Sequence, residues 1–198
     1  MNHSARRYQL QYEKKLNGPL GILLIVSGLF TFAFGMFTPI YAIFIESIGG
    51  GVREAANAWA IFSLTAGLLT FVAGKWENKI KETELGIVFS QFILGVAYVF
   101  FLIADDVLML YLAQACLGAG MAFFWPAFHS SYGKHTTKKE APWQWSFYDG
   151  LSYLLPAVAA VAGGSVVENF GFGAMFMIMA GISFCCGLFV LVLPRKAL

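Results

Sequence analysis

The chain has 198 residues, of which 59% are hydrophobic and only 12% are charged. Its mean hydropathy is +0.70. A soluble domain carries about 25% charged residues, so this composition excludes a soluble globular protein and predicts an integral, multi-pass membrane protein. The net charge of +2 is small, and the positions of the charges carry more information than their sum.

The chain begins with a polar, basic segment, residues 1–18. Its Lys and Arg residues are interleaved with apolar side chains, a pattern that fits a short helix on an anionic membrane surface or a frayed basic tail. No cleavable signal peptide precedes the first apolar run. Asn17, followed by Gly18 and Pro19, predicts the start of the first helix.

Six apolar segments follow, each long enough to cross a bilayer, which takes roughly 20 residues of helix. They cover about residues 20–46, 56–75, 85–104, 107–132, 146–168 and 172–193. Together they form a predicted membrane domain over residues 19–194, followed by a short tail at 195–198. The predicted fold class is an all-α membrane protein with six transmembrane helices.

The basic residues lie on one side of this topology. Twelve of the 13 Lys and Arg residues fall near the termini or after the second and fourth spans, and only Arg53 falls on the opposite side. Basic residues favour the cytoplasmic side of a membrane. We therefore expect both terminal segments, 1–18 and 195–198, in the cytoplasm, and the protein in the inner membrane.

A weak internal repeat divides the chain in two. The tripeptide Phe-Thr-Pro at 37–39 resembles Phe-Trp-Pro at 124–126, and Gly86 pairs with Gly173, both at an offset of 87 residues. This pattern predicts two three-helix units. Because each unit has an odd number of spans, the second runs inverted relative to the first, a recurring construction of secondary transporters.

The fourth predicted span carries small, polar and aromatic residues along one helical face. Such a face indicates a helix turned towards a cavity or towards another helix, and ordinary packing remains the alternative for its glycines. The residues at this spacing are Gln114, Gly118, Met121, Trp125, His129 and Tyr132.

Three stretches carry a resemblance to a known family. Gly118-Ala119-Gly120, with Pro126 beyond it, resembles the glycine-rich fourth helix of the major facilitator superfamily of transporters. The loop from Gly74 through Asn78 to Lys79 lies where that superfamily has a glycine–acid–base signature. Residues 159–164 resemble the end of its fifth helix. The chain thus resembles one six-helix half of a major facilitator fold, whereas typical members join two such halves.

The departures from the family pattern affect the expected mechanism. Asn78 stands where an aspartate is expected and Lys81 where a glycine is expected. Gln114 occupies the place of a fourth-helix arginine associated with proton coupling. Because the spans also lack a central acidic residue, we expect no proton relay. The resemblance then implies facilitated diffusion of a neutral or weakly polar solute by alternating access.

A single half would expose its cavity face and its small-residue faces to lipid. Small faces let helices approach closely in membranes, and in the resembled fold spans two and five meet the opposite half. We therefore expect a two-fold homodimer, with packing inside the unit, a sister half or a longer parent chain as alternatives. The expected dimer interface, which we call the seam, consists of Ala56, Ala60, Ser63, Gly67, Thr70 and Gly74 in span two and of Ser152, Pro156, Ala159, Ala160 and Gly163 in span five.

The candidate cavity residues are uncharged hydrogen-bonding or aromatic side chains. Thr31, Thr38 and Gln114 are the expected polar liners, and Trp125 is placed to stack on a flat apolar or sugar-like face. An aromatic near the cytoplasmic interface is the alternative for Trp125. His129 is a fifth candidate, either for proton coupling or as an ordinary interfacial histidine.

Other function classes find less support. His129 and Ser130 are adjacent, and no GxSG or HExxH motif is present, so we expect no enzyme. The three cysteines match no zinc spacing, and we expect no cofactor, no metal and no nucleic-acid partner. The expected partners are lipid, a small solute and a second half. A solute-binding subunit of a separate energised transporter, or a channel, remains an alternative.

Overall fold

The computed structural model describes residues 16–77, 79 and 82–194. The expectations for the basic residues of the segment before residue 16, for Asn78, for Lys81 and for the tail at 195–198 lie outside the described residues. Everything below concerns the described part of the chain.

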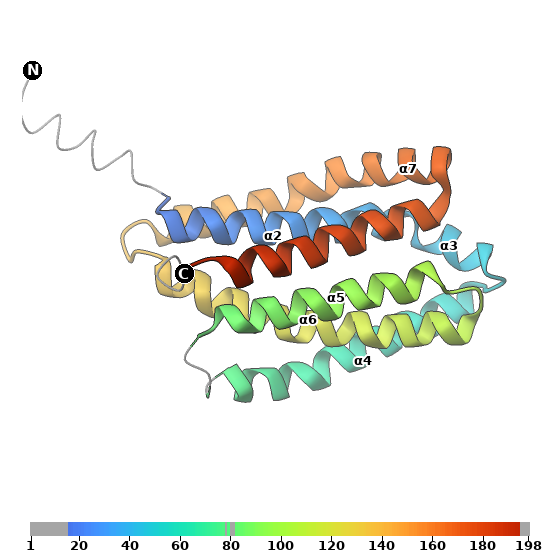
Figure 1. Ribbon diagram of the computed structural model, residues 1–198, viewed down its shortest axis with the longest axis horizontal. Helices are drawn as coiled ribbons and strands as arrows, with labels where there is room; N and C mark the ends of the chain where they lie inside the picture. The colour runs from blue at the N-terminus through green and yellow to red at the C-terminus, as the bar shows by residue number, and fades with distance from the viewer. Residues whose placement is uncertain (1–15, 78, 80–81, 195–198) are drawn as a thin grey trace, which may run out of the picture.

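The described chain is a bundle of helices that run roughly parallel to one axis (Figure 1). The described ranges contain no strand. Five helical stretches are long and apolar enough to cross a membrane. The elements are α2 (Gly18–Phe37), η1 (Thr38–Ile40), α3 (Tyr41–Ser47), α4 (Val52–Glu77), α5 (Glu84–Leu102), α6 (Val107–His135) and α7 (Ala141–Val192).

The fifth and sixth predicted spans lie in α7, within which two helices meet at a kink. Helix α7 has 52 residues, and its backbone is non-helical only at Gly171, where φ is +80°. A residue without a Cβ adopts this left-handed conformation at little cost. The chain therefore reverses at one glycine without a connecting loop, and α7 doubles back on itself (Figure 1). We refer to residues 141–170 as its first arm and to residues 172–192 as its second arm.

Local sequence signals explain where several helices begin or break. The Asn17 side chain accepts a hydrogen bond from the Leu20 backbone N–H at 2.9 Å, which caps α2 as predicted. Asp106 caps α6 in the same way through Met109 at 2.7 Å. The first predicted span is interrupted by the 3-10 turn η1, which contains Pro39.

Two close helix pairs frame the bundle, and each is made possible by a glycine. A Cβ on Gly118 of α6 would lie 2.6 Å from the Phe62 carbonyl oxygen of α4. A Cβ on Gly163, in the first arm of α7, would fall onto the Met36 carbonyl of α2. Small residues permit this backbone approach in membrane bundles. Gly118 therefore serves helix packing, which was one of its two predicted roles.

Aromatic side chains fill the core at the end of the bundle away from the chain ends. The Phe176 ring lies 5.0 Å from Phe37, 5.0 Å from Phe44 and 5.4 Å from Phe101 between ring centroids. These rings join α2, α3, α5 and the second arm of α7. Aromatic pairs at such distances add to the stabilisation that comes from burial alone.

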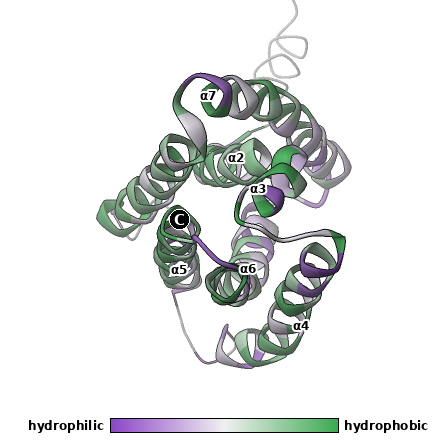
Figure 2. Ribbon diagram, turned by 90° about the vertical axis from the view of Figure 1, so that its right-hand side faces the viewer, coloured by the Kyte–Doolittle hydropathy of each residue, from purple (hydrophilic) through white to green (hydrophobic). Residues whose placement is uncertain are grey.

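Helix α4 is the least covered helix of the bundle. It packs against α6 and buries only Ala58 and Ala73. Figure 2 shows α4 at the edge of the bundle, beside α6. A long membrane helix with one covered face leaves most of its surface for lipid or for another protein.

Among the described residues, one buried side-chain amide has no hydrogen-bond partner at either of its polar atoms. Gln91 of α5 is 0% exposed, and both polar atoms of its side chain are unpartnered. Replacing an unsatisfied polar group by an apolar group of similar size removes a cost of about 1–3 kcal/mol. We expect Gln91→Leu to raise the thermal melting temperature of the purified protein. An unchanged or lowered melting temperature would mean that the amide has a partner in the native bundle.

Candidate functional site: a cavity between α2, α6 and α7

A hollow of about 440 Å³ lies between α2, α6 and the first arm of α7. Thr31, Thr38 and Trp125, three of the five predicted cavity residues, line it. Ser152 and Pro156, predicted for the seam, line it as well. The remaining lining residues are Phe30, Phe34, Gly35, Pro39, Met121 and Tyr153.

The cavity wall is aromatic, with few polar groups. Trp125 meets Phe30 edge-on, with ring centroids 5.6 Å apart. The Thr38 hydroxyl donates to the Phe34 carbonyl at 2.9 Å, and the Ser152 hydroxyl donates to the Tyr148 carbonyl at 3.0 Å. Because these hydroxyls bond back to their own helices, they add little polarity. None of the described residues that line this hollow is charged, so the hollow suits an uncharged solute with an apolar body.

A second hollow, about 300 Å³, continues the cavity towards the end of the bundle where α7 begins. It shares Trp125, Ser152 and Tyr153 with the first hollow, and His129 and Asp149 line its far part. The His129 ring is 5.4 Å from Trp125 between centroids. The structure thus places His129 at the mouth of the cavity, and Asp149 supplies a carboxylate there.

Gln114 does not line the main cavity. It lies in a small hollow of about 40 Å³ between α2, α4 and α6. Its side-chain nitrogen donates to the Tyr41 hydroxyl at 2.7 Å. Sequence reasoning missed Tyr41, because one tyrosine among many aromatic residues of a membrane chain gives no distinguishing signal.

The predicted seam residues divide into two groups. Along α4, five of the six are exposed, and Gly67 and Gly74 have open space where a Cβ would point. In the first arm of α7, Ala159 and Gly163 are buried. Gly163 lies against α2, as described above, and Ala159 lies against Gly35 of the same helix. These two residues pack inside the chain and are not available for a seam, whereas Ala160 is half-buried.

No metal centre is visible within residues 16–77, 79 and 82–194. No three His, Cys, Asp or Glu side chains of these ranges gather so that they could hold an ion.

Comparison with known proteins identifies the family. The model of the Major Facilitator Superfamily matches residues 23–197, which is most of the chain. The chain belongs to the Major Facilitator Superfamily. It is 23% identical over 168 residues to the multidrug resistance protein MdtG of Klebsiella pneumoniae (strain 342). That alignment covers 83% of this chain and 40% of the relative.

The fold of this Major Facilitator Superfamily chain matches that of a solved member. A crystal structure of PepTSo, a transporter of the POT family, superposes with a TM-score of 0.68 at 14% sequence identity. The match covers 88% of this chain and 37% of PepTSo. The chain thus spans about 40% of the length of the curated relative that it matches.

The loop after α4, where the superfamily has its signature, adjoins a polar network that the sequence did not predict. The Thr83 and Ser131 hydroxyls are 2.8 Å apart, and Lys134 donates to Thr83 at 3.2 Å. Glu77 reaches the start of α5, and one of its carboxylate oxygens is buried without a partner. Two residues of the predicted loop motif are described. Gly74, near the end of α4, is half-buried, and Lys79 is exposed.

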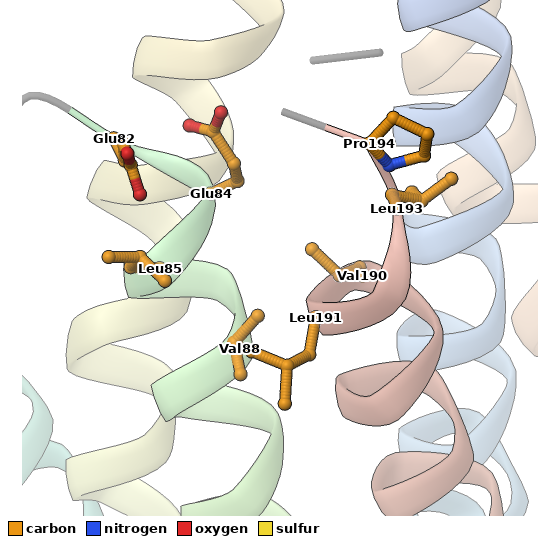
Figure 3. Close-up of a pocket in the computed structure, with 8 residues that line it drawn as sticks. All are labelled: Glu82, Glu84, Leu85, Val88, Val190, Leu191, Leu193 and Pro194. Carbon is orange, nitrogen blue, oxygen red and sulfur yellow. The ribbon is translucent and has the colours of Figure 1, made fainter. Parts of the chain in front are cut away.

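A further hollow, of about 90 Å³, opens between the start of α5 and the end of α7. Figure 3 shows Glu82 and Glu84 on its α5 side, facing Val190, Leu193 and Pro194 on the α7 side. None of the predicted site residues lines it. It shares no lining residue with the cavity, so we do not assign it to the site.

Proposed function

We propose that this chain is half of a secondary transporter that moves a neutral or weakly polar solute by alternating access, and that a second copy completes it. The main support is the 440 Å³ cavity, whose wall is aromatic and carries no charged side chain. The name of the relative MdtG, a multidrug resistance protein, agrees with a solute that has an apolar body.

We further propose that the two arms of α7 cross the membrane separately, which gives six crossings. Each arm is long enough for the roughly 20 residues that a crossing requires. Helix α2 begins and α7 ends at the same end of the bundle (Figure 1), as an even number of crossings requires. The loop with Lys138 and Lys139 lies at the same end of the bundle as the chain ends, and Arg53 lies at the opposite end. This distribution of basic residues favours cytoplasmic termini and an inner-membrane location.

The pairing of helices supports an inverted repeat. The first unit would contain α2 with α3, α4 and α5, and the second unit α6 and the two arms of α7. Helix α4 of the first unit packs on α6, and the first arm of α7 packs correspondingly on α2. Exchanging the two units preserves this pattern of contacts. Inverted repeats of this kind allow a central site to open to either side in turn.

The proposal of a homodimer is supported by helix faces that remain exposed in the single chain. The seam we propose consists of the exposed small residues of α4 together with Ser152, Pro156 and Ala160 of α7. Ser152 and Pro156 line the cavity, so a second copy placed on this seam would also close the cavity. In such a two-fold dimer each cavity residue of one copy has a symmetry mate in the second copy, so every lining residue would appear twice around one solute.

Counterflow in liposomes tests the proposed carrier directly. N-acetyltryptophanamide is a suitable probe because it is uncharged and combines an indole with amide groups. We expect vesicles preloaded with unlabelled probe to accumulate the labelled probe transiently, as a carrier requires. Binding of the probe without counterflow would contradict alternating access, and steady leakage in both directions would indicate a channel.

Filling the cavity should stop transport. Thr31→Trp places a bulky ring in the hollow, so we expect counterflow to fall at least about tenfold, since overpacking costs roughly 1–3 kcal/mol. Ile25→Trp is the matched control, because Ile25 lies on the same helix and is 57% exposed. Equal counterflow for both variants would place the solute elsewhere. Size-exclusion profiles of both proteins check that they are folded.

A further inference from the structure

Gln114 carries a hydrogen-bond acceptor that no described residue satisfies. Its side chain is 2% exposed, its nitrogen donates to Tyr41, and its oxygen Oε1 is buried without a partner. Buried polar groups in native proteins are almost always paired, and each exception calls for an explanation. A donor that arrives with the solute provides one.

The acceptor faces a space that can hold such a donor. The hollow that Gln114 and Tyr41 line measures about 40 Å³, room for about three water-sized groups. Phe34, Phe37, Trp59 and Leu117 provide apolar walls. In such surroundings a hydrogen bond is stronger than in water, and a missing one is correspondingly more costly.

Tyr41 adds the complementary group beside this acceptor. Its hydroxyl accepts the hydrogen bond from Gln114 and keeps its own proton, which is available to donate. Gln114 and Tyr41, which we call the polar pair, therefore present one acceptor and one donor side by side. A single ionised group cannot use both, whereas a neutral carboxamide can.

The small hollow adjoins the main cavity. Phe34 and Thr38 line both. A solute whose apolar body fills the main cavity can therefore reach the polar pair with one small terminal group. This arrangement resembles other ligand sites, in which a few polar groups in an apolar pocket fix orientation and specificity.

We propose that the polar pair is a specificity site for a carboxamide group of the solute. The carboxamide N–H donates to Gln114 Oε1, and its carbonyl accepts from the Tyr41 hydroxyl. The inference rests on the proposed function, because the body of the same solute occupies the main cavity. It narrows the solute class from neutral compounds in general to neutral compounds with a terminal amide and an apolar body.

A pair of probes that differ in one group tests this site. N-acetyltryptophanamide carries a terminal carboxamide. N-acetyltryptophan methyl ester keeps the same body, with its acetamido and indole N–H groups, and a terminal carbonyl, but it lacks the N–H donors of the terminal carboxamide. With the full-length protein in detergent, isothermal titration should show about tenfold tighter binding of the amide. Sites built to bond a polar group reject analogues that lack it.

Two variants assign the preference to Gln114. In Gln114→Leu we expect the amide to bind as weakly as the ester, while ester binding is unchanged and shows that the cavity is intact. Gln91→Leu is the matched control, because it also removes a buried amide but lines none of the hollows described above. It should retain the tenfold preference.

The outcomes separate the two proposals. Equal binding of both probes to the unchanged protein, or a preference that survives in Gln114→Leu, overturns the specificity site and leaves the main cavity standing. Failure of both probes to bind overturns the solute cavity, and the specificity site with it. A preference that is also lost in Gln91→Leu overturns the assignment to Gln114.

Discussion

Gly163→Ala is expected to destabilise the folded protein strongly, although the change adds a single methyl group. The new Cβ would fall onto the Met36 carbonyl and lie 2.8 Å from the Met36 Cα. Since these are backbone atoms, the two helices must separate. We expect a loss of roughly 3 kcal/mol in the free energy of unfolding, at the upper end of the cost of overpacking.

The neighbouring glycine provides the control. A Cβ on Gly164 would have open space around it, and alanine favours a helix over glycine by about 1 kcal/mol. Gly164→Ala should therefore melt at the same or a higher temperature than the unchanged protein in the same detergent. Equal melting of the two variants would mean that α7 does not approach α2 as described.

Gly67→Leu is expected to separate the proposed dimer without unfolding the chain. The residue is exposed, and nothing in the chain lies within 4 Å of a Cβ at that position, so the larger side chain costs the single bundle little. A second copy packed there would have to withdraw. Overpacking of roughly 1–3 kcal/mol corresponds to about 5- to 150-fold weaker association, which cross-linking in liposomes can measure.

The same substitution elsewhere separates seam effects from general ones. Gly181, in the second arm of α7, is also exposed and also has open space around it, but it lies outside the proposed seam. Gly181→Leu should leave both dimers and counterflow intact. If Gly67→Leu keeps its dimers while remaining folded, α4 is not the seam.

The family and the helical class were predictable from sequence because they depend on composition, length and short motifs. Which helix covers which face was less predictable. Ala159 and Gly163 have the same spacing and size as residues expected at a seam, yet α2 covers them. Helical periodicity identifies a face, but it does not identify the neighbour that packs on it.

Two further differences have local causes. The sequence predicted a short connection at 169–171 between the fifth and sixth spans. In the structure the helical backbone is broken only at Gly171, because one left-handed glycine replaces a loop. Gln114 was expected in the main cavity. The structure instead places it in the small side hollow, beside Tyr41. Side-chain partners that are 73 residues apart in the chain leave no pattern in a single sequence.

The central claim is that one transport unit contains two copies of this chain around a shared cavity. Fluorescently labelled protein can be reconstituted at fewer than one transport unit per liposome, so that the copies in each active vesicle are counted by photobleaching. The account predicts that vesicles showing N-acetyltryptophanamide counterflow contain two bleaching steps. Sustained counterflow in vesicles with a single fully labelled copy would contradict it.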